Sequence, residues 1–140
     1  MDRYEICMRG NVQEIGNALI EGKLDLNYAL AIACRYGSVD VLQFLLKYNS
    51  NLPKNYDWAM ACAAQGGHVE IVVLMLELGA KEYLWTLDNA STYGHVDIVA
   101  LILEKYTGEP LNYDPYIINA KNTEVREFLE TCKYGKRKIP

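Results

Sequence analysis

A three-residue motif recurs five times along the chain, and its spacing is the feature that most constrains the fold. The copies are Gly10-Asn11-Val12, Gly37-Ser38-Val39, Gly67-His68-Val69, Gly94-His95-Val96 and a degenerate Lys121-Asn122-Thr123. Their first residues lie 27, 30, 27 and 27 positions apart. A fixed period of roughly 20 to 50 residues is typical of a stacked array of similar units. The spacing therefore argues against a single compact core.

The residues after each motif predict a helix with one broad apolar face. Apolar residues recur at helical spacing after the second, third and fourth motifs. The sets are Val39, Leu42 and Leu45; Val69, Val72 and Met75; and Val96, Val99 and Ile102. Asn11, Ser38 and Asn122 precede three of these second helices and are good N-cap residues. The width of the apolar face predicts that each second helix is covered by neighbours on two sides.

A short first helix precedes each motif. The pattern predicts first helices over residues 2–9, 28–36, 58–66, 85–93 and 112–120. One position in three of them holds Ala33, Ala63 or Ala90, and small residues allow helices to approach closely. Two antiparallel helices per unit predict an all-α solenoid whose first helices form a concave face.

Two strings carry a resemblance to a known family. Ala-Ala-Gln-Gly-Gly-His-Val-Glu-Ile-Val (63–72) and Tyr-Gly-His-Val-Asp-Ile-Val-Ala-Leu-Ile-Leu-Glu (93–104) resemble the ankyrin repeat. The resemblance spans residues 2–132 and implies an ankyrin-repeat solenoid of about five helix-turn-helix units, with three central repeats between two terminal caps. The expected units cover residues 1–25, 26–54, 55–82, 83–110 and 111–132, and a basic tail follows over 133–140.

The repeats are shorter than those of the family. Against about 33 residues for a typical ankyrin unit, spacings of 27 and 30 are deficient between the second helix and the next first helix. The family forms its β-hairpin fingers there, so we expect fingers reduced to turns. Such finger-poor repeats resemble the large ankyrin families encoded by giant DNA viruses of amoebae.

The histidines and cysteines do not form a pattern that suggests chemistry. His68 and His95 share a repeat position, and equivalent positions lie about 8 to 10 Å apart, too far to hold one metal ion without other ligands. Each is expected to start a helix and to hydrogen-bond to backbone. Cys7 and Cys34 occupy one position that elsewhere holds a small residue, which predicts a small buried side chain. We expect no metal, no cofactor and no enzymatic activity.

The resemblance also implies a binding surface. In the ankyrin family, the two positions before the glycine face the groove, so the candidate partner-binding residues are Arg35, Tyr36, Gln65, Thr92, Tyr93 and Asn119. This mixture of tyrosine, arginine and adaptable polar groups suits a protein interface. Three further aromatic residues open first helices and are expected to pack on the neighbouring unit: Tyr28, Trp58 and Trp85. The function implied is that of a monomeric module that binds an unidentified protein partner.

The charge distribution bears on the class of partner. The net charge is −4, but the last eight residues hold four basic residues and no acid, which leaves −8 for residues 1–132. An acidic folded part disfavours nucleic acid as the main partner. The basic tail supports an alternative function, a localisation tether to anionic lipid or nucleic acid. No apolar run is long enough to span a membrane and no signal peptide is evident, so we expect a cytoplasmic protein, in the host cytoplasm if it is viral.

Overall fold

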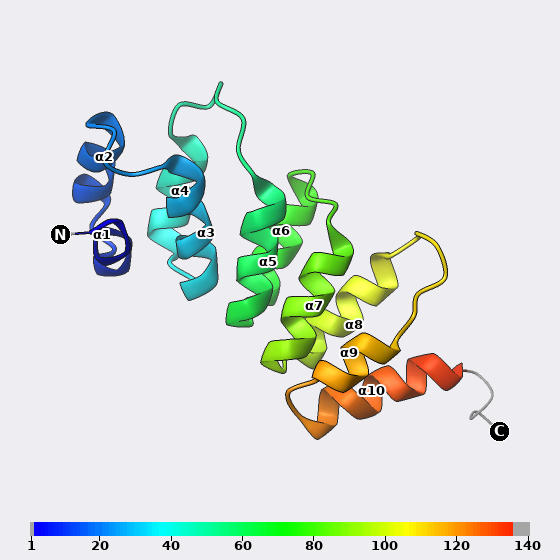
Figure 1. The fold of residues 1–140 in the computed structure, drawn as a ribbon. Helices are drawn as coiled ribbons and strands as arrows, with labels where there is room; N and C mark the ends of the chain where they lie inside the picture. Colours follow the sequence, from blue (N-terminus) through cyan, green and yellow to red (C-terminus); the bar gives the residue numbers. More distant parts are fainter. Residues whose placement is uncertain (1, 136–140) are drawn as a thin grey trace.

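The computed structural model describes residues 2–135, and over that range it contains ten helices and no strand (Figure 1). The helices are α1 (Arg3–Arg9), α2 (Val12–Ile20), α3 (Leu26–Tyr36), α4 (Val39–Lys47), α5 (Tyr56–Gly66), α6 (Val69–Glu77), α7 (Tyr83–Tyr93), α8 (Val96–Lys105), α9 (Asp114–Asn119) and α10 (Thr123–Tyr134). The predicted all-α solenoid of five helix pairs is therefore confirmed. The connections between pairs are turns and bends in place of β-hairpin fingers.

The helix pairs are stacked in a row with α1 and α2 at one end and α9 and α10 at the other (Figure 1). First helices pack side by side, α3 on α5 and α5 on α7, and each central first helix also packs on its own second helix. One continuous apolar core runs between the two layers. Leu45, Met75, Ile102 and Leu129 occupy the same position in successive second helices, and each is fully buried.

The central first helices begin two residues earlier than the sequence pattern predicted. They start at Leu26, Tyr56 and Tyr83. The side chains of Asp25 and Asn55 cap the first two of these helices by accepting hydrogen bonds, each 2.9 Å long, from the third backbone N–H of the helix. The two caps lie three residues before the aromatic residues that had marked the expected starts. In the last pair, α9 is shorter than predicted because Pro115 defines its first turn.

Two of the three predicted N-cap residues of the second helices make a side-chain capping hydrogen bond. The Asn11 carboxamide accepts a hydrogen bond from Glu14 N at 3.0 Å, and that of Asn122 accepts one from Val125 N at 2.9 Å. Both predicted N-caps are confirmed. Ser38 also occupies the predicted N-cap position, that of α4, but its side chain makes no capping hydrogen bond.

Histidine side chains connect successive units. His68 Nε2 lies 3.0 Å from the carbonyl oxygen of Arg35, and His95 Nε2 lies 3.1 Å from that of Gln65. The expected bond from each histidine to backbone is therefore present, but the backbone belongs to the preceding unit. Asn122 takes this role at the next boundary, where its Nδ2 donates to the carbonyl oxygen of Gly94 at 3.2 Å. The second residue of the motif therefore makes a hydrogen bond across each of three successive unit boundaries.

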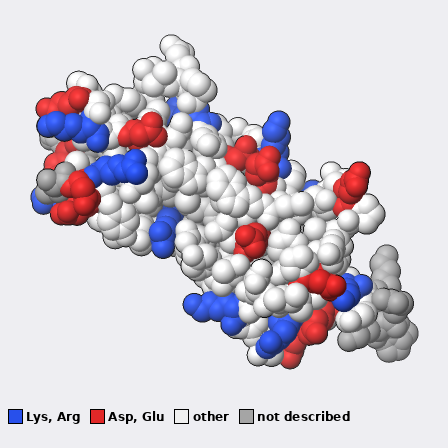
Figure 2. Space-filling view, in the orientation of Figure 1, with Lys and Arg blue, Asp and Glu red and all other residues white. Residues whose placement is uncertain are grey.

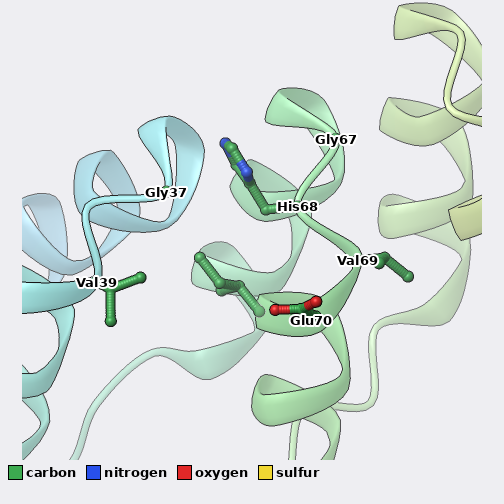
Figure 3. A pocket seen from close by; sticks show the side chains of 7 residues that line it. Gly37, Val39, Gly67, His68, Val69 and Glu70 are labelled. Atoms are coloured by element: carbon green, nitrogen blue, oxygen red, sulfur yellow. The ribbon is translucent and has the colours of Figure 1, made fainter.

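The motif glycine provides the space for these rings. Gly37 adopts a φ of +67°, a left-handed conformation that favours glycine. A Cβ atom at Gly37 would also lie 2.7 Å from the ring of His68, and one at Gly67 would lie 2.6 Å from the ring of His95. Figure 3 shows His68 next to Gly37 and Gly67, at the edge of a small pocket lined by this junction. The pocket therefore belongs to the boundary between two units, since it is lined by motif residues and by the start of α6.

Acidic and amide side chains from one first helix fix the start of the next. Asn27 Oδ1 accepts a hydrogen bond from Asn55 N at 2.8 Å. Asp57, at the same repeat position, accepts from Lys81 N at 2.7 Å and from Glu82 N at 3.2 Å. These bonds restrain the shortened connections. They satisfy backbone donors that have no partner inside a helix.

The histidine links should contribute measurably to stability. We expect His95→Ala to lower the free energy of unfolding by about 1 kcal/mol, because the carbonyl of Gln65 loses a half-buried donor. His95→Asn should lose less, since asparagine performs the same task at position 122. Urea denaturation of the two variants measures the difference. Equal losses in both would show that the ring packing, and not the hydrogen bond, stabilises the boundary.

Two hydroxyl groups in α7 are buried without a hydrogen-bond partner. Thr86 Oγ1 and Ser91 Oγ are both fully buried and unpaired among the described residues. The equivalent positions of the preceding unit hold Ala59 and Ala64, so the framework does not require a polar group at either place.

Removing these hydroxyls should stabilise the protein. We expect Thr86→Val and Ser91→Ala each to raise the free energy of unfolding by about 1 kcal/mol, because an unsatisfied buried polar group is costly. Thr92→Val, an exposed change in the same helix, should change it by less than about 0.5 kcal/mol. Thermal and urea unfolding provide the measurement. Destabilisation by both core substitutions would contradict the assignment of these hydroxyls as unpaired.

Candidate functional site

The first helices present one exposed face, which we call the first-helix face. It consists of the sides of α1, α3, α5, α7 and α9 that are turned away from the second helices (Figure 1). The candidate residues lie at or next to the C-terminal ends of these helices. Arg35 and Tyr36 end α3, Gln65 is near the end of α5, Thr92 and Tyr93 end α7, and Asn119 ends α9.

The candidate residues differ in exposure. Tyr36 and Tyr93 expose 39% and 40% of their surfaces, and Thr92 and Asn119 are also exposed. Arg35 and Gln65 are half-buried, and their backbone carbonyls accept the histidine bonds of the next unit. The backbone that carries these two side chains is therefore fixed by the repeat framework.

Tyr36 is paired with a tyrosine of α1 that the sequence pattern did not single out. The hydroxyl oxygens of Tyr4 and Tyr36 lie 2.6 Å apart, and their rings meet edge-on with centroids 6.4 Å apart. The hydrogen bond with Tyr36 raises the pKa of the Tyr4 phenol. Arg35 completes this group with its guanidinium carbon 5.4 Å from the Tyr36 ring centroid. Tyr4 was missed because Ala31 and Ala61 hold its repeat position in the next two units.

A second aromatic group lies beside the first. Tyr28 and Trp58 pack with ring centroids 6.3 Å apart, so the predicted contact between neighbouring units is confirmed for this pair. Arg3 lies over the Tyr28 ring, with its guanidinium carbon 4.0 Å from the centroid. Trp85, for which the same contact was expected, leaves 43% of its surface exposed and has no ring partner among the described residues.

The two halves of the first-helix face differ in charge. Arg3 and Arg35 belong to the half formed by α1 and α3, whereas α7 carries the exposed carboxylate of Asp88. Burial raises the pKa of Tyr116 in α9, and the nearby charge of Asp88 raises it further. Figure 2 shows positive and negative groups at both ends of the molecule, with a few charged groups scattered over the mostly uncharged area between them.

The cysteines are buried or half-buried thiols. Cys7 and Cys34 are buried as predicted, and desolvation raises the pKa of their thiols to about 11 and about 12. Both are therefore protonated at neutral pH and are poor nucleophiles. Within residues 2–135 no group of three His, Cys, Asp or Glu side chains is arranged to hold a metal ion.

This architecture defines a helical repeat protein with one variable exposed face. Residues 4–84, more than half of the chain, match the family model for ankyrin repeats, in three copies. The chain therefore belongs to the ankyrin-repeat family, and α7 and α8 continue the same helix pairing beyond the matched region. A comparison with curated proteins gave no match. No helix within residues 2–135 has the length and apolarity needed to cross a membrane.

The raised pKa of Cys34 predicts a pH dependence of stability. An unfolded thiol ionises near pH 9.0, whereas the folded one ionises near 12, so its contribution is complete below pH 9.0 and is lost as the pH rises towards 12. Over that interval, the unfolding free energy of the wild type should fall relative to that of Cys34→Ala as the pH rises. The relative fall should be at most about 1.4 kcal/mol per pH unit. Urea titrations at several pH values measure it. Parallel curves would contradict the assignment.

Proposed function

We propose that the protein is a non-enzymatic module that binds a protein partner through the concave first-helix face. Ankyrin repeats generally act as protein–protein interaction modules, and the family is typically non-enzymatic. The proposed contact residues are Arg35, Tyr36, Gln65, Thr92, Tyr93 and Asn119.

Variation within a fixed frame is the observation that carries this proposal. The position two residues before each of the last four motifs holds Arg35, Gln65, Thr92 and Asn119 in successive units. The neighbouring framework is nearly constant, with a glycine in the left-handed conformation in three of these units and a side chain bonded across each boundary between them. Packing between units therefore explains why the framework residues recur, but it does not explain why the residues two positions before the motif differ.

Tyr36 and Tyr93 give the proposed contact residues the composition of an interface. Tyrosine combines a large apolar ring with a hydroxyl group and loses little conformational entropy on binding, and it is enriched among the residues that dominate binding energy. Tyr36 is held in place by Tyr4, whereas Tyr93 is exposed at the end of α7. We expect Tyr36 to be the more preorganised of the two.

The setting of this interaction is part of the proposal. We infer that the protein acts as a monomer in the cytoplasm. If the finer resemblance to giant DNA viruses of amoebae reflects the source of the chain, the partner is a host protein and the cytoplasm is that of the host. The support for this setting is the sequence alone, through the finger-poor repeats and the spacing of their motifs.

The alternative function, a tether formed by the basic tail, stays a sequence-based prediction. Lys133 forms an ion pair with Asp114 in which Nζ and Oδ1 are 2.6 Å apart, so its charge is partly engaged within the fold. Lys136, Arg137 and Lys138 lie outside the described residues. No contact among residues 2–135 favours the tether over the first-helix face.

Replacing Arg35, Tyr36, Gln65, Thr92 and Tyr93 together with alanine should abolish partner binding. The loss should exceed about 100-fold in affinity, since tyrosine and arginine anchors each contribute strongly. Helical content should persist, because the histidine bonds use the backbone carbonyls at positions 35 and 65. Quantitative pull-down from the natural host, followed by measurement of Kd with the recovered partner, tests this.

A matched control changes five exposed residues of the second helices to alanine: Gln43, Lys47, Val73, Glu77 and Glu104. That variant should retain the partner. Retention by the first-helix variant together with loss by the control would place the binding surface on the opposite side of the array and overturn the proposal.

A further inference from the structure

Resting on the function proposed above, we infer that the α1–α3 half of the first-helix face binds an acidic segment of the partner protein. Aspartate or glutamate carboxylates of that segment pair with Arg3 and Arg35. The surface concerned is the arginine–aromatic cluster, which consists of Arg3, Tyr4, Tyr28, Arg35, Tyr36 and Trp58.

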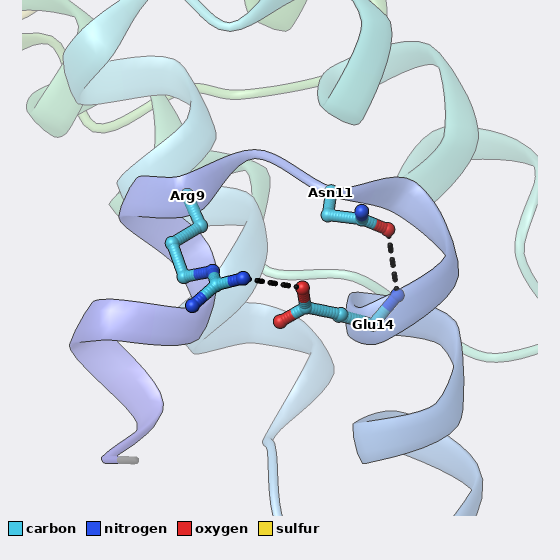
Figure 4. A network of polar contacts seen from close by, with 3 residues as sticks. All are labelled: Arg9, Asn11 and Glu14. Atoms are coloured by element: carbon cyan, nitrogen blue, oxygen red, sulfur yellow. Dashed lines mark hydrogen bonds and ion pairs between the residues drawn. The ribbon is translucent and has the colours of Figure 1, made fainter.

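The two guanidinium groups have no anionic partner within the described part of the chain. Neither Arg3 nor Arg35 has a carboxylate within 4.0 Å, and neither side chain makes a hydrogen bond with another described residue. Arg9 of α1 provides the contrast, because its Nη2 lies 3.0 Å from Glu14 Oε1 (Figure 4). Arg9 is already paired, whereas the donors of Arg3 and Arg35 remain available.

Aromatic rings orient both available guanidiniums. Arg3 lies over Tyr28 at 4.0 Å and Arg35 lies near Tyr36 at 5.4 Å, each measured from the guanidinium carbon to the ring centroid. A ring against one face of the guanidinium leaves its N–H groups directed outward in the guanidinium plane. That arrangement suits bidentate hydrogen bonding to a carboxylate. The side-chain entropy lost on pairing is reduced because the rings already restrict the arginines.

The two arginines belong to one continuous surface. Tyr4 follows Arg3 in α1 and donates to, or accepts from, the Tyr36 hydroxyl, beside Arg35. Tyr28 in turn packs on Trp58 of the next unit. A bound segment would therefore meet guanidiniums flanked by aromatic rings, and the rings would contact the apolar side chains next to its acids.

Charge complementarity selects the acidic peptide over other anions. Residues 1–132 carry a net charge of −8, so the protein as a whole repels extended polyanions and anionic membranes. Within α1 and α3 the exposed Glu5 is the single carboxylate beside Arg3, Arg9 and Arg35, so these two helices carry an excess of positive charge that suits a short segment with a few carboxylates. Asp88 in α7 gives the other half of the face an exposed negative charge, which disfavours binding of the segment's carboxylates there.

Selection from a random 12-residue peptide library, displayed on phage and presented to the intact protein, tests this inference. Enriched peptides should contain aspartate or glutamate, and synthetic copies should bind more weakly at high salt. R3Q and R35Q should each weaken binding about tenfold, because each removes a charge-assisted pair. R9Q is the matched control in the same helix and should leave binding unchanged. The double variant R3E/R35E should select basic peptides instead.

The outcomes separate this inference from the proposed function. Peptides without acids whose binding is lost in the five-alanine variant would overturn the inference and leave the proposed function standing. Acidic peptides insensitive to R3Q and R35Q would do the same. Failure to enrich any peptide that depends on the first-helix face would count against both. Circular dichroism confirms that each variant is folded.

Discussion

Each helix pair in this array buries its apolar side only because another pair lies against it. Leu45, Met75, Ile102 and Leu129 recur at one position of successive second helices and are fully buried between layers that no single unit could supply. Stability in such arrays is shared among nearest-neighbour interfaces. The boundary between units is therefore the element on which the rest of the structure depends, and its chemistry is repeated in the glycine, the histidine and the buried apolar positions.

The boundary also determines which residues are available for binding. His68 and His95 occupy the space that glycine leaves open and bond to the carbonyls of Arg35 and Gln65. The same bonds fix the backbone at which the first-helix face presents its variable side chains. The residues that join the units are thus adjacent in sequence to the exposed residues of the first-helix face, but the two sets have different roles. This separation allows the exposed residues to differ from unit to unit without disturbing the stack.

Local signals in the sequence predicted most of the architecture. The motifs located the starts of the second helices, because a cap and a left-handed glycine are properties of adjacent residues. The first-helix starts were misplaced by two residues because the caps Asp25 and Asn55 precede the aromatic residues that drew attention. The Tyr4–Tyr36 pair and the histidine links join residues about one repeat apart, so only the stacking of units reveals them. Candidate residues in α3 to α9 followed from the family resemblance, whereas Arg3 was missed because the first unit departs from the pattern.

Native-state hydrogen exchange of the unmodified protein tests most directly whether the units support one another as neighbours. The three central pairs, from α3 to α8, have neighbours on both sides, so the account predicts the greatest protection there, with less in α1 and α2 and in α9 and α10. Protection that is uniform from α1 to α10, or greatest in the terminal units, would contradict it, because either result would require a core that does not depend on the contacts between neighbouring pairs.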